Sequence, residues 1–437
     1  MKVSASASVF AALIVWPRVA SGQAHGTHSD TAKPVAVGAQ AIGVMTRQSP
    51  ALGGRAFTEG YLTQPTLMAH ARGRSNVASL QAMLSLEGWT LERGELNPGI
   101  VGEGYIDRRH PHTYLHELTG TVQHGVGRAR GSLTIGKGFA PFGTDDPMVR
   151  PFVKYPINHH LAQILERIVA IAALSTGPLV IEAGAFNGDE PEGSGDAPNS
   201  RRLWDSWSAR ATILPTAGAE AQASFASVKS PEVAAGGGTD DRKWSVSARL
   251  ESPHERRYAL AEWARTTEYA GGSRAFSFSS YLLETESSAG RLVLAARLEV
   301  TERPDEERLA DRFRTPPSGH DFSILGRSRW TIGTLKVAAP FSPGAGAGLA
   351  PFAELAFHRV RETLRPSAFV PDQFYGSDRI WTITLGARLT FGAVHQRMGR
   401  YGAAIPRRRG TNSRHHCTNI GCGTANSELP VLCRGCR

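Results

Sequence analysis

The chain has 437 residues, of which 41% are hydrophobic and 20% are charged, with a formal net charge of +10 and a mean hydropathy of −0.24. Beyond the N-terminus, no stretch reaches the roughly 18 apolar residues that a membrane-spanning helix needs, which excludes a helical membrane protein. The four cysteines all lie at or after Cys417, which excludes a disulfide scaffold for the rest of the chain.

The first 24 residues have the layout of a secretory signal peptide. Lys2 precedes an apolar run over residues 9–16, and small residues follow up to Ala24. This layout predicts export and cleavage near Gly22 or Ala24, with a buried N-terminal helix as the alternative. Residues 25–56 are small and polar without a period, so they predict a disordered lead-in.

From Tyr61 onward, apolar and polar residues alternate with period two. Trp244 and Val246, for example, fall on one face of their segment, and Lys243 and Ser245 fall on the other. Such alternation predicts half-buried strands. About sixteen strands are expected, with 14–18 as the range. They lie near residues 61–72, 77–90, 99–107, 114–125, 129–139, 168–175, 177–187, 205–214, 218–228, 242–251, 257–268, 274–285, 290–302, 322–337, 348–360 and 377–391.

The connections between these segments alternate in length. Those containing "VGR", "STG", "PTAG" and "SSAG" are very short, whereas 140–167, 188–204, 229–241, 303–321 and 361–376 are long. Short periplasmic turns at one end and long outside loops at the other are typical of an up-and-down outer-membrane barrel. The predicted fold is therefore an all-β, antiparallel transmembrane β-barrel over residues 57–391.

A soluble β-sandwich is the rival fold. Its strands usually have about five or six residues, whereas the segments here match the length of a tilted strand that crosses a bilayer. Aromatic residues on the apolar faces fit the girdles that flank the lipid, and Phe391 ends a segment that resembles the terminal recognition strand of outer-membrane barrels. The predicted interface aromatics are Trp207, Trp244, Trp330, Trp381 and Phe391.

Three short stretches carry a resemblance to a known group. "GKGFAPFGTDD" (136–146), "LVIEAGAFNGDEPEG" (179–193) and "SWSARATILP" (206–215) resemble successive strand and loop passages of the phosphate-selective (O/P-type) porins. The resemblance covers roughly residues 129–215 and implies a porin-like fold that passes small solutes. The stretch "MVRPFVKYPINHHLAQILER" departs from the group, and the lysine ladders that would imply phosphate selectivity are missing.

Residues 140–167 form the longest connection and are too apolar for a free surface loop. Residues 157–167 are expected to form a short helix with Leu161, Ile164 and Leu165 on one side. A loop that folds into the lumen would constrict it and set its selectivity; an exposed, solvated loop is the alternative. The constriction candidates are Lys137, Asp145, Asp146, Arg150, Lys154, His159, His160, Glu166 and Arg167.

Strand parity places further charges on the polar faces, which would line the lumen. The basic residues predict a mild anion preference, which Glu182, Glu251 and Glu299 offset in part. These lumen-facing charges are Arg210, Lys243, Arg249, Arg291, Arg297 and Arg388.

A histidine-rich stretch raises the question of a metal. His110, His112 and His116 share strand parity, and imidazole is a common ligand of zinc, copper and nickel. Pro111 disrupts regular pairing there, so we expect a histidine-rich loop rim. The stretch "HGTHS" (25–29) would bind copper only if processing exposed it. No metal and no cofactor is predicted.

The end of the chain has a different composition. Six arginines against one glutamate after Ala403 supply +5 of the net charge of +10, so the remaining basic bias does not indicate a nucleic-acid partner. Cys417, Cys422, Cys433 and Cys436 have spacings that the common zinc sites do not use. Residues 392–437 are therefore expected to be a disordered or non-native tail, with a zinc knuckle as the alternative.

The sequence thus predicts an exported outer-membrane channel for passive diffusion of small hydrophilic solutes. Its partners would be the lipid bilayer, these solutes and, through the last strand, the barrel-assembly machinery, with a homo-oligomer allowed. A loop-filled adhesion or structural barrel without a pore is the first alternative. A membrane-embedded hydrolase is the second, but no Gly-x-Ser-x-Gly, His-Glu-x-x-His or glycine-rich phosphate loop occurs, so no enzyme is expected.

Overall fold

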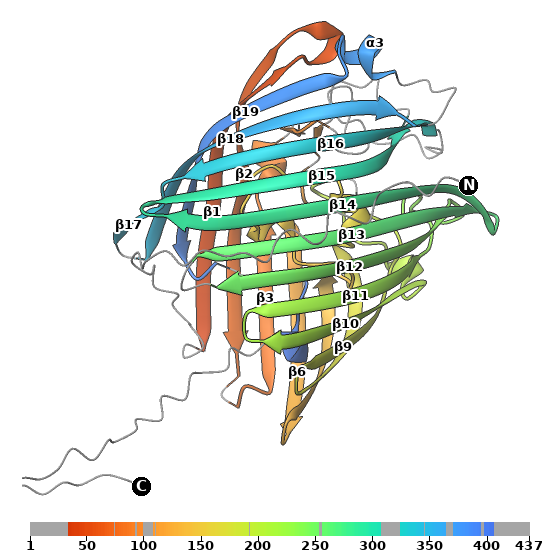
Figure 1. Cartoon of the computed structure of the whole chain (residues 1–437). Helices are drawn as coiled ribbons and strands as arrows, with labels where there is room; N and C mark the ends of the chain where they lie inside the picture. The colour runs from red at the N-terminus through yellow and green to blue at the C-terminus, as the bar shows by residue number, and fades with distance from the viewer. Residues whose placement is uncertain are drawn as a thin grey trace, which may run out of the picture. The chain divides into compact units, whose positions relative to one another are not determined.

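A computed structural model describes residues 34–405, except residues 74, 92–93, 99–107, 110, 192, 253–255, 307–323, 345, 364–369 and 395–396. In this part of the chain, one antiparallel sheet closes on itself as a barrel (Figure 1). The sheet has 17 strands, but the short β17 (Phe341–Gly344) only extends one hairpin, so 16 strands form the wall. The predicted fold class is confirmed.

The wall strands follow one another in chain order, each paired with its neighbours, as an up-and-down topology requires. They are β1 (Val35–Ser49), β2 (Phe57–Arg72), β3 (Ala78–Ser85), β6 (Leu115–Val126), β7 (Ala129–Gly138), β8 (Arg167–Thr176), β9 (Leu179–Phe186), β10 (Ser206–Thr216), β11 (Ala219–Val228), β12 (Asp240–Ser252), β13 (Arg257–Ala270), β14 (Ser273–Ala289), β15 (Leu292–Glu306), β16 (Ile324–Ala338), β18 (Ala347–Glu362) and β19 (Arg379–Gly392).

The first strand, β1, closes the barrel by pairing with β19 from Gly38↔Gly392 to Ser49↔Trp381. The prediction of a disordered lead-in over 25–56 is therefore wrong for its described part, and the barrel begins at Val35 rather than at residue 57. The physical reason is that β19 cannot leave an edge unpaired in lipid, where each unsatisfied backbone group costs several kcal/mol. The predicted signal peptide lies outside the described residues.

The predicted strand at 99–107 also lies outside the described residues, and the wall passes directly from β3 to β6. The intervening connection contains α1 (Glu87–Thr90) and a small ladder of β4 (Glu95–Leu96) with β5 (Arg108–Arg109). The other two α-helices of the described residues are α2 (His159–Ala162) and α3 (Pro371–Tyr375). Helix α2 falls in the predicted range 157–167 but has only four residues, because Gln163 is already extended (φ −142°, ψ 161°).

The two ends of the barrel differ, as the alternating connections predicted. The short-turn end carries the turns at 127–128, 177–178, 217–218 and 290–291, and the long-loop end carries 86–114, 139–166 and 187–205. The hairpin at Gly271–Gly272 is the exception, a two-residue turn at the long-loop end with φ of 55° and 86°. Among the described residues, no helix is long and apolar enough to cross a membrane.

The faces of the wall are separated by polarity. Large apolar side chains such as Ile135, Leu298 and Leu335 point outward and are 60–63% exposed. Their polar neighbours, such as Thr134, Glu299 and Thr334, point inward and are buried. Because the outer coat is apolar along the middle of the strands, the wall has the surface that lipid requires.

Aromatic side chains mark the ends of the outer face. Trp207 and Trp244 flank Phe225, with ring centroids 5.3 and 4.4 Å from it, near the long-loop end. Trp381 lies near that end as well, and Phe391 near the other, and both are exposed. These four positions suit an interfacial girdle.

The predicted position of Trp330 is wrong, because its ring is fully buried inside the barrel. It packs edge-on against Tyr375 of α3, with ring centroids 6.2 Å apart. Its neighbour Ile332 is also inward and buried, whereas Leu335 points outward. Beside Trp330 the inward face of β16 is therefore apolar, whereas the outward neighbours Arg329 and Thr331 are exposed and polar, so hydrophobicity alone pointed to the wrong face.

A charge on the outer face should destabilise the barrel according to its depth. Leu298 lies in the middle of β15 opposite Gly333, and Ala289 ends β14. Leu298→Arg is expected to lower the free energy of unfolding by about 2–4 kcal/mol, and Ala289→Arg by about 0–1 kcal/mol. Urea unfolding in lipid vesicles, followed by tryptophan fluorescence, measures both. Equal costs for the two variants would contradict a lipid-facing coat.

Candidate functional site: the barrel interior

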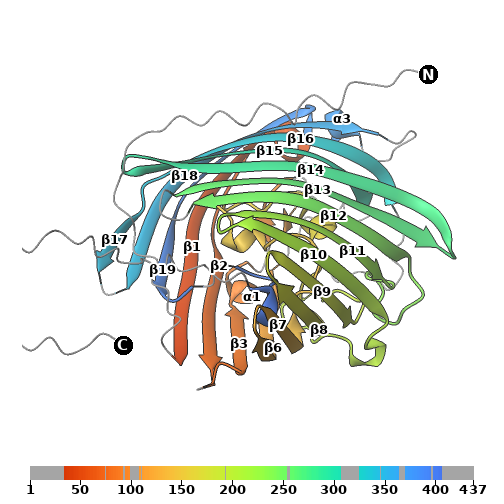
Figure 2. The same ribbon diagram turned by 60° about the horizontal axis from the view of Figure 1, so that its bottom comes forward.

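The connection 139–166 folds into the barrel instead of covering its outside. The yellow part of the chain lies within the ring of strands in Figure 2. Phe142, Met148 and Phe152 are at most 2% exposed, so the apolar residues that made a surface loop implausible are packed inside. Its two ends also touch, because a Cβ on Gly143 would lie 1.8 Å from the carbonyl oxygen of Ala162. We call residues 144–161 the inner loop.

Carboxylates of the wall bind the backbone of the inner loop. Glu354 accepts a hydrogen bond from the Val153 amide (2.7 Å). Glu299 accepts one from the Ile157 amide (2.9 Å). Glu262 accepts from the hydroxyl of Thr144, with 2.8 Å between the oxygens. Amides that cannot join a helix or sheet are thereby satisfied by charged acceptors.

Basic side chains of the wall bind the carbonyl oxygens of the same segment. Arg297 Nη1 donates to Lys154 O (2.8 Å), Lys243 Nζ to His160 O (2.8 Å) and Lys336 Nζ to Pro151 O (2.6 Å). Arg210 Nη1 donates to Gly143 O (3.1 Å) just before the inner loop. The inward charges of the wall therefore hold the loop.

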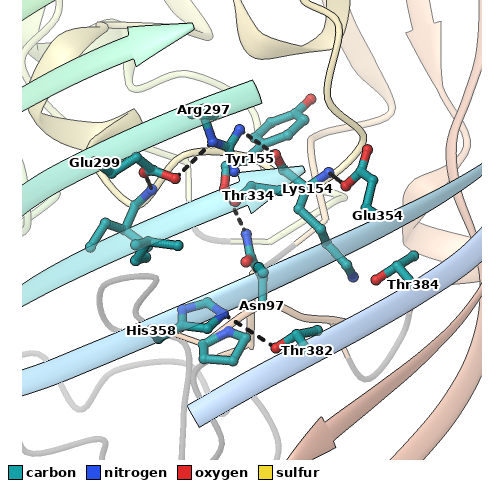
Figure 3. Close-up of a pocket in the computed structure, with 14 residues that line it drawn as sticks. Asn97, Lys154, Tyr155, Arg297, Glu299, Thr334, Glu354, His358, Thr382 and Thr384 are labelled. Atoms are coloured by element: carbon teal, nitrogen blue, oxygen red, sulfur yellow. Dashed lines mark hydrogen bonds and ion pairs between the residues drawn. The ribbon is translucent and has the colours of Figure 1, made fainter. Parts of the chain in front are cut away.

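A small cavity remains between the inner loop and the wall of β15, β16, β18 and β19 (Figure 3). Arg297 pairs with Glu299 at 2.7 Å on one side of it, and Lys154 pairs with Glu95 at 3.0 Å. Asn97 reaches in and donates to Tyr155 O (3.0 Å). The cavity has about 20 Å³, room for about one water molecule. Its lining combines the charged Lys154, Arg297, Glu299 and Glu354 with apolar and hydroxyl side chains.

Histidines and carboxylates form a buried group beside the inner loop. His112 lies 2.8 Å from Glu87, His116 lies 2.8 Å from Glu166, and these two rings lie 4.6 Å apart. His112 and His116 thus sit inside the barrel, whereas a loop rim was predicted; His110 lies outside the described residues. Within the described ranges, no group of three or more His, Cys, Asp or Glu residues is arranged to hold a metal ion.

The third histidine of this group, His159, lies 3.5 Å from Asp146. Burial lowers the pKa of His159 to about 4, although the adjacent carboxylate acts in the opposite direction. Burial would raise the pKa of Asp146, but the neighbouring histidines lower it to about 2. At neutral pH the pair is a neutral imidazole beside an ionised carboxylate, so the inner loop keeps a negative charge here.

The chain beyond β19 turns back into the barrel at the short-turn end. We call residues 397–405 the C-terminal segment. Tyr401 accepts a hydrogen bond from the Phe139 amide (3.0 Å), and Ser132 accepts one from the Ala403 amide (2.9 Å). The prediction of a disordered tail over 392–437 is wrong for this part, because its apolar and arginine side chains find partners inside the barrel; residues 406–437 lie outside the described residues.

Two arginines of the C-terminal segment join an ion-pair network. Arg400 contacts Glu220 and Glu182, and Arg397 contacts Glu220 and Asp145. Burial and the nearby Arg210 lower the pKa of Arg400 to about 10. Burial alone would raise the pKa of Asp145, but the arginines facing it lower the pKa below its ordinary value.

The structure places the predicted constriction residues at the inner loop and its flanks. Eight of the nine are buried, and His160 is partly exposed, 3.4 Å from Glu190. The eight are Lys137, Asp145, Asp146, Arg150, Lys154, His159, Glu166 and Arg167.

One of the predicted lumen-facing charges does not face the lumen. Arg291 lies in the exposed turn before β15, where the ladder has not begun, so its assignment is wrong. The other five, Arg210, Lys243, Arg249, Arg297 and Arg388, face the interior.

Sequence reasoning missed several interior residues. Glu262, Glu284 and Glu354 have inward parity on strands that were correctly predicted, so the same alternation would have found them. Arg397 and Arg400 carried no such signal, because they follow the last strand. Glu87 lies in α1, whose position inside the barrel depends on tertiary contacts with β2 such as the Gln64 amide to Glu87 hydrogen bond (2.9 Å).

A closed wall of 16 strands, apolar outside and polar inside, with a long connection packed within, defines a porin-type barrel. No protein-family model and no curated protein sequence matches the chain.

Among solved structures, the chain is similar to an anion-selective porin from Comamonas acidovorans (9% identity, TM-score 0.48, 82% of this chain and 99% of that one). It is also similar to a loop L8 deletion mutant of OmpT, an outer membrane protein of Vibrio cholerae (10%, 0.47, 82% and 99%). A third is OccK2 of Pseudomonas aeruginosa (12%, 0.39, 83% and 98%).

Proposed function

We propose that this protein is an outer-membrane channel through which small hydrophilic solutes diffuse. The observation that carries the proposal is the closed barrel of 16 strands with an apolar outer coat and a charged interior. Barrels of this size enclose more space than wall side chains fill. The inner loop and its charged partners then form the constriction, as carboxylate and basic side chains do in selective pores.

The loop-filled barrel without a pore is the second candidate. The cavity of about 20 Å³ beside Arg297 favours it, because a solute larger than water does not fit there. Under our proposal, the inner loop and the C-terminal segment move when the channel conducts. Export through the signal peptide, assembly through the last strand, a homo-oligomer and the absence of enzymatic activity remain predictions.

A mild anion preference is part of the proposal. Arg388 faces the interior, and among the described residues one of its terminal nitrogens has no hydrogen-bond partner, so it offers positive charge to a solute once the inner loop moves. The other inward basic residues are compensated by carboxylates, as in the pair of Arg210 with Glu182. We therefore expect a weak preference and no phosphate site.

Planar-bilayer recording tests the function. The full-length protein should give discrete current steps, with a reversal potential in a salt gradient that indicates weak anion selectivity. Absence of current from both the correctly folded full-length chain and a chain truncated after Val394 would contradict a channel and favour the loop-filled barrel. A cation-selective reversal potential would contradict only the anion preference.

A further inference from the structure

We propose that the C-terminal segment (residues 397–405) is an autoinhibitory plug that closes the barrel from the short-turn end. This inference rests on the proposed channel function. Figure 2 shows the dark blue end of the described chain inside the ring of strands, beside β6, β7 and β8. Met398, Arg400 and Ala403 are at most 2% exposed, so the segment fills its part of the interior.

The plug is held by side chains and not by the sheet. As far as the structure describes the chain, the plug pairs with no wall strand. Its backbone hydrogen bonds from Ala404 to Tyr401 (2.9 Å) and from Ile405 to Gly402 (3.3 Å) are internal. The wall reaches it through Arg130, which donates to the carbonyls of Ala403 and Ile405. A segment attached in this way can leave without breaking the barrel ladder.

A carboxylate site in the interior receives the two arginines of the plug. Glu182 and Glu220 come from β9 and β11, and Asp145 comes from the inner loop. Each is at most 8% exposed. Glu182 also pairs with Arg210, and Asp145 with Arg249, whereas both cations that Glu220 contacts in the described part of the chain belong to the plug. A buried carboxylate without a cation is strongly destabilised. The site therefore favours the inserted state and also links the plug to the inner loop through Asp145.

The site is not fully satisfied, which makes insertion reversible. Arg400 Nε and Asp145 Oδ1 lie 3.8 Å apart, and neither atom has a hydrogen-bond partner among the described residues. Arg210 adds a third guanidinium nearby and donates to Gly399 O (2.6 Å). Like charges in one buried site reduce the gain from insertion. The plug can thus close the channel most of the time and still be released.

Three variants test the plug through the open fraction of the channel in single-channel recordings. Truncation after Val394 removes the plug and keeps the hydrogen bond from the Ala393 amide to Val37 O (2.9 Å). R397E/R400E keeps the chain but sets carboxylates against the acidic site. The open fraction of each variant should rise at least about tenfold. Breaking a buried ion pair costs more free energy than a tenfold change in an equilibrium constant corresponds to.

Gly402→Val tests the same step without a change of charge. Gly402 has φ +50°, and a Cβ there would lie 2.5 Å from Ser132 Oγ and 2.8 Å from Thr121 Cγ2. The valine should expel the plug and raise the open fraction like R397E/R400E. Arg379→Glu is the control for charge, because this side chain is 66% exposed, lies 3.8 Å from Asp378 and begins β19 at the long-loop end. It should leave the open fraction unchanged.

Trypsin gives a readout that does not need current. In the folded wild type, fragments ending at Arg397 or Arg400 should be absent. The single variants R397E and R400E should each be cleaved at the arginine that remains. G402V should be cleaved at both arginines. Equal cleavage of folded and heat-unfolded wild type would overturn the plug. Protection with an unchanged open fraction after truncation would overturn its gating role but leave the channel. Silence of every variant would refute the channel and the gate together.

Discussion

Excision of the inner loop, residues 144–161, should raise the conductance of the open state severalfold. Gly143 and Ala162 already touch, so a two-glycine linker can join them without moving the wall. The loop occupies the region that Glu354, Glu299 and Arg297 face, and its removal leaves their charges lining water. A wider, hydrated path passes more ions, because the constriction sets the conductance. Single-channel recording in planar bilayers measures the change.

A matched excision serves as the control. Residues 231–237 belong to the connection between β11 and β12, and Gly238 donates to Ser230 Oγ (2.8 Å), so Ser230 can be joined to Gly238. This connection is largely exposed, and its loss should leave the conductance unchanged. An unchanged conductance after removal of the inner loop, in a barrel that folds and opens, would show that the loop is not the constriction.

Replacement of Arg210 by alanine should lower the free energy of unfolding by about 3–5 kcal/mol. Two nitrogens of Arg210 donate to Glu182, both at 2.7 Å, and each residue is 1% exposed. The same guanidinium binds Gly143 O, which precedes the inner loop. Without it, Glu182 is a buried carboxylate whose remaining cation is Arg400 at 3.5 Å. Urea unfolding in detergent micelles, followed by tryptophan fluorescence, measures the loss.

Arg329→Ala is the control, because it removes an ion pair of similar length in a different environment. Arg329 pairs with Glu302 at 2.6 Å, but its side chain is 51% exposed, so the expected cost is about 0–1 kcal/mol. The double variant R210M/E182L removes both buried charges and should recover most of the stability. A cost of Arg210→Ala as small as that of Arg329→Ala would show that the interior is more hydrated than the contacts indicate.

Most of the wall was predictable because lipid imposes a simple rule on it. A strand such as β12 alternates Trp244 and Val246 outward with Lys243 and Ser245 inward, and this period is visible in any single sequence. The missed strand, β1, carries Ala39, Ala41 and Gly43 on its outer face, so its apolar signal is weak.

The interior was only partly predictable. Strand parity put Arg297 and Glu299 on the inner face, but it could not identify the groups that they bind. Arg297 binds Lys154 O, and Glu299 binds the Ile157 amide. The two partners are separated in the sequence by 143 positions in the first contact and by 142 positions in the second. The plug was missed for the same reason, because Arg400 finds Glu220 only after the barrel has closed.

The sequence by itself determined the class of barrel, the number of strands within a narrow range and the two unequal ends. These features follow from the period of the strands and the lengths of the connections, which are local properties. Only the tertiary structure decided that the inner loop and the C-terminal segment fill the interior. Their insertion depends on apolar packing and charge pairing between distant segments, and such partners leave no local pattern in the chain.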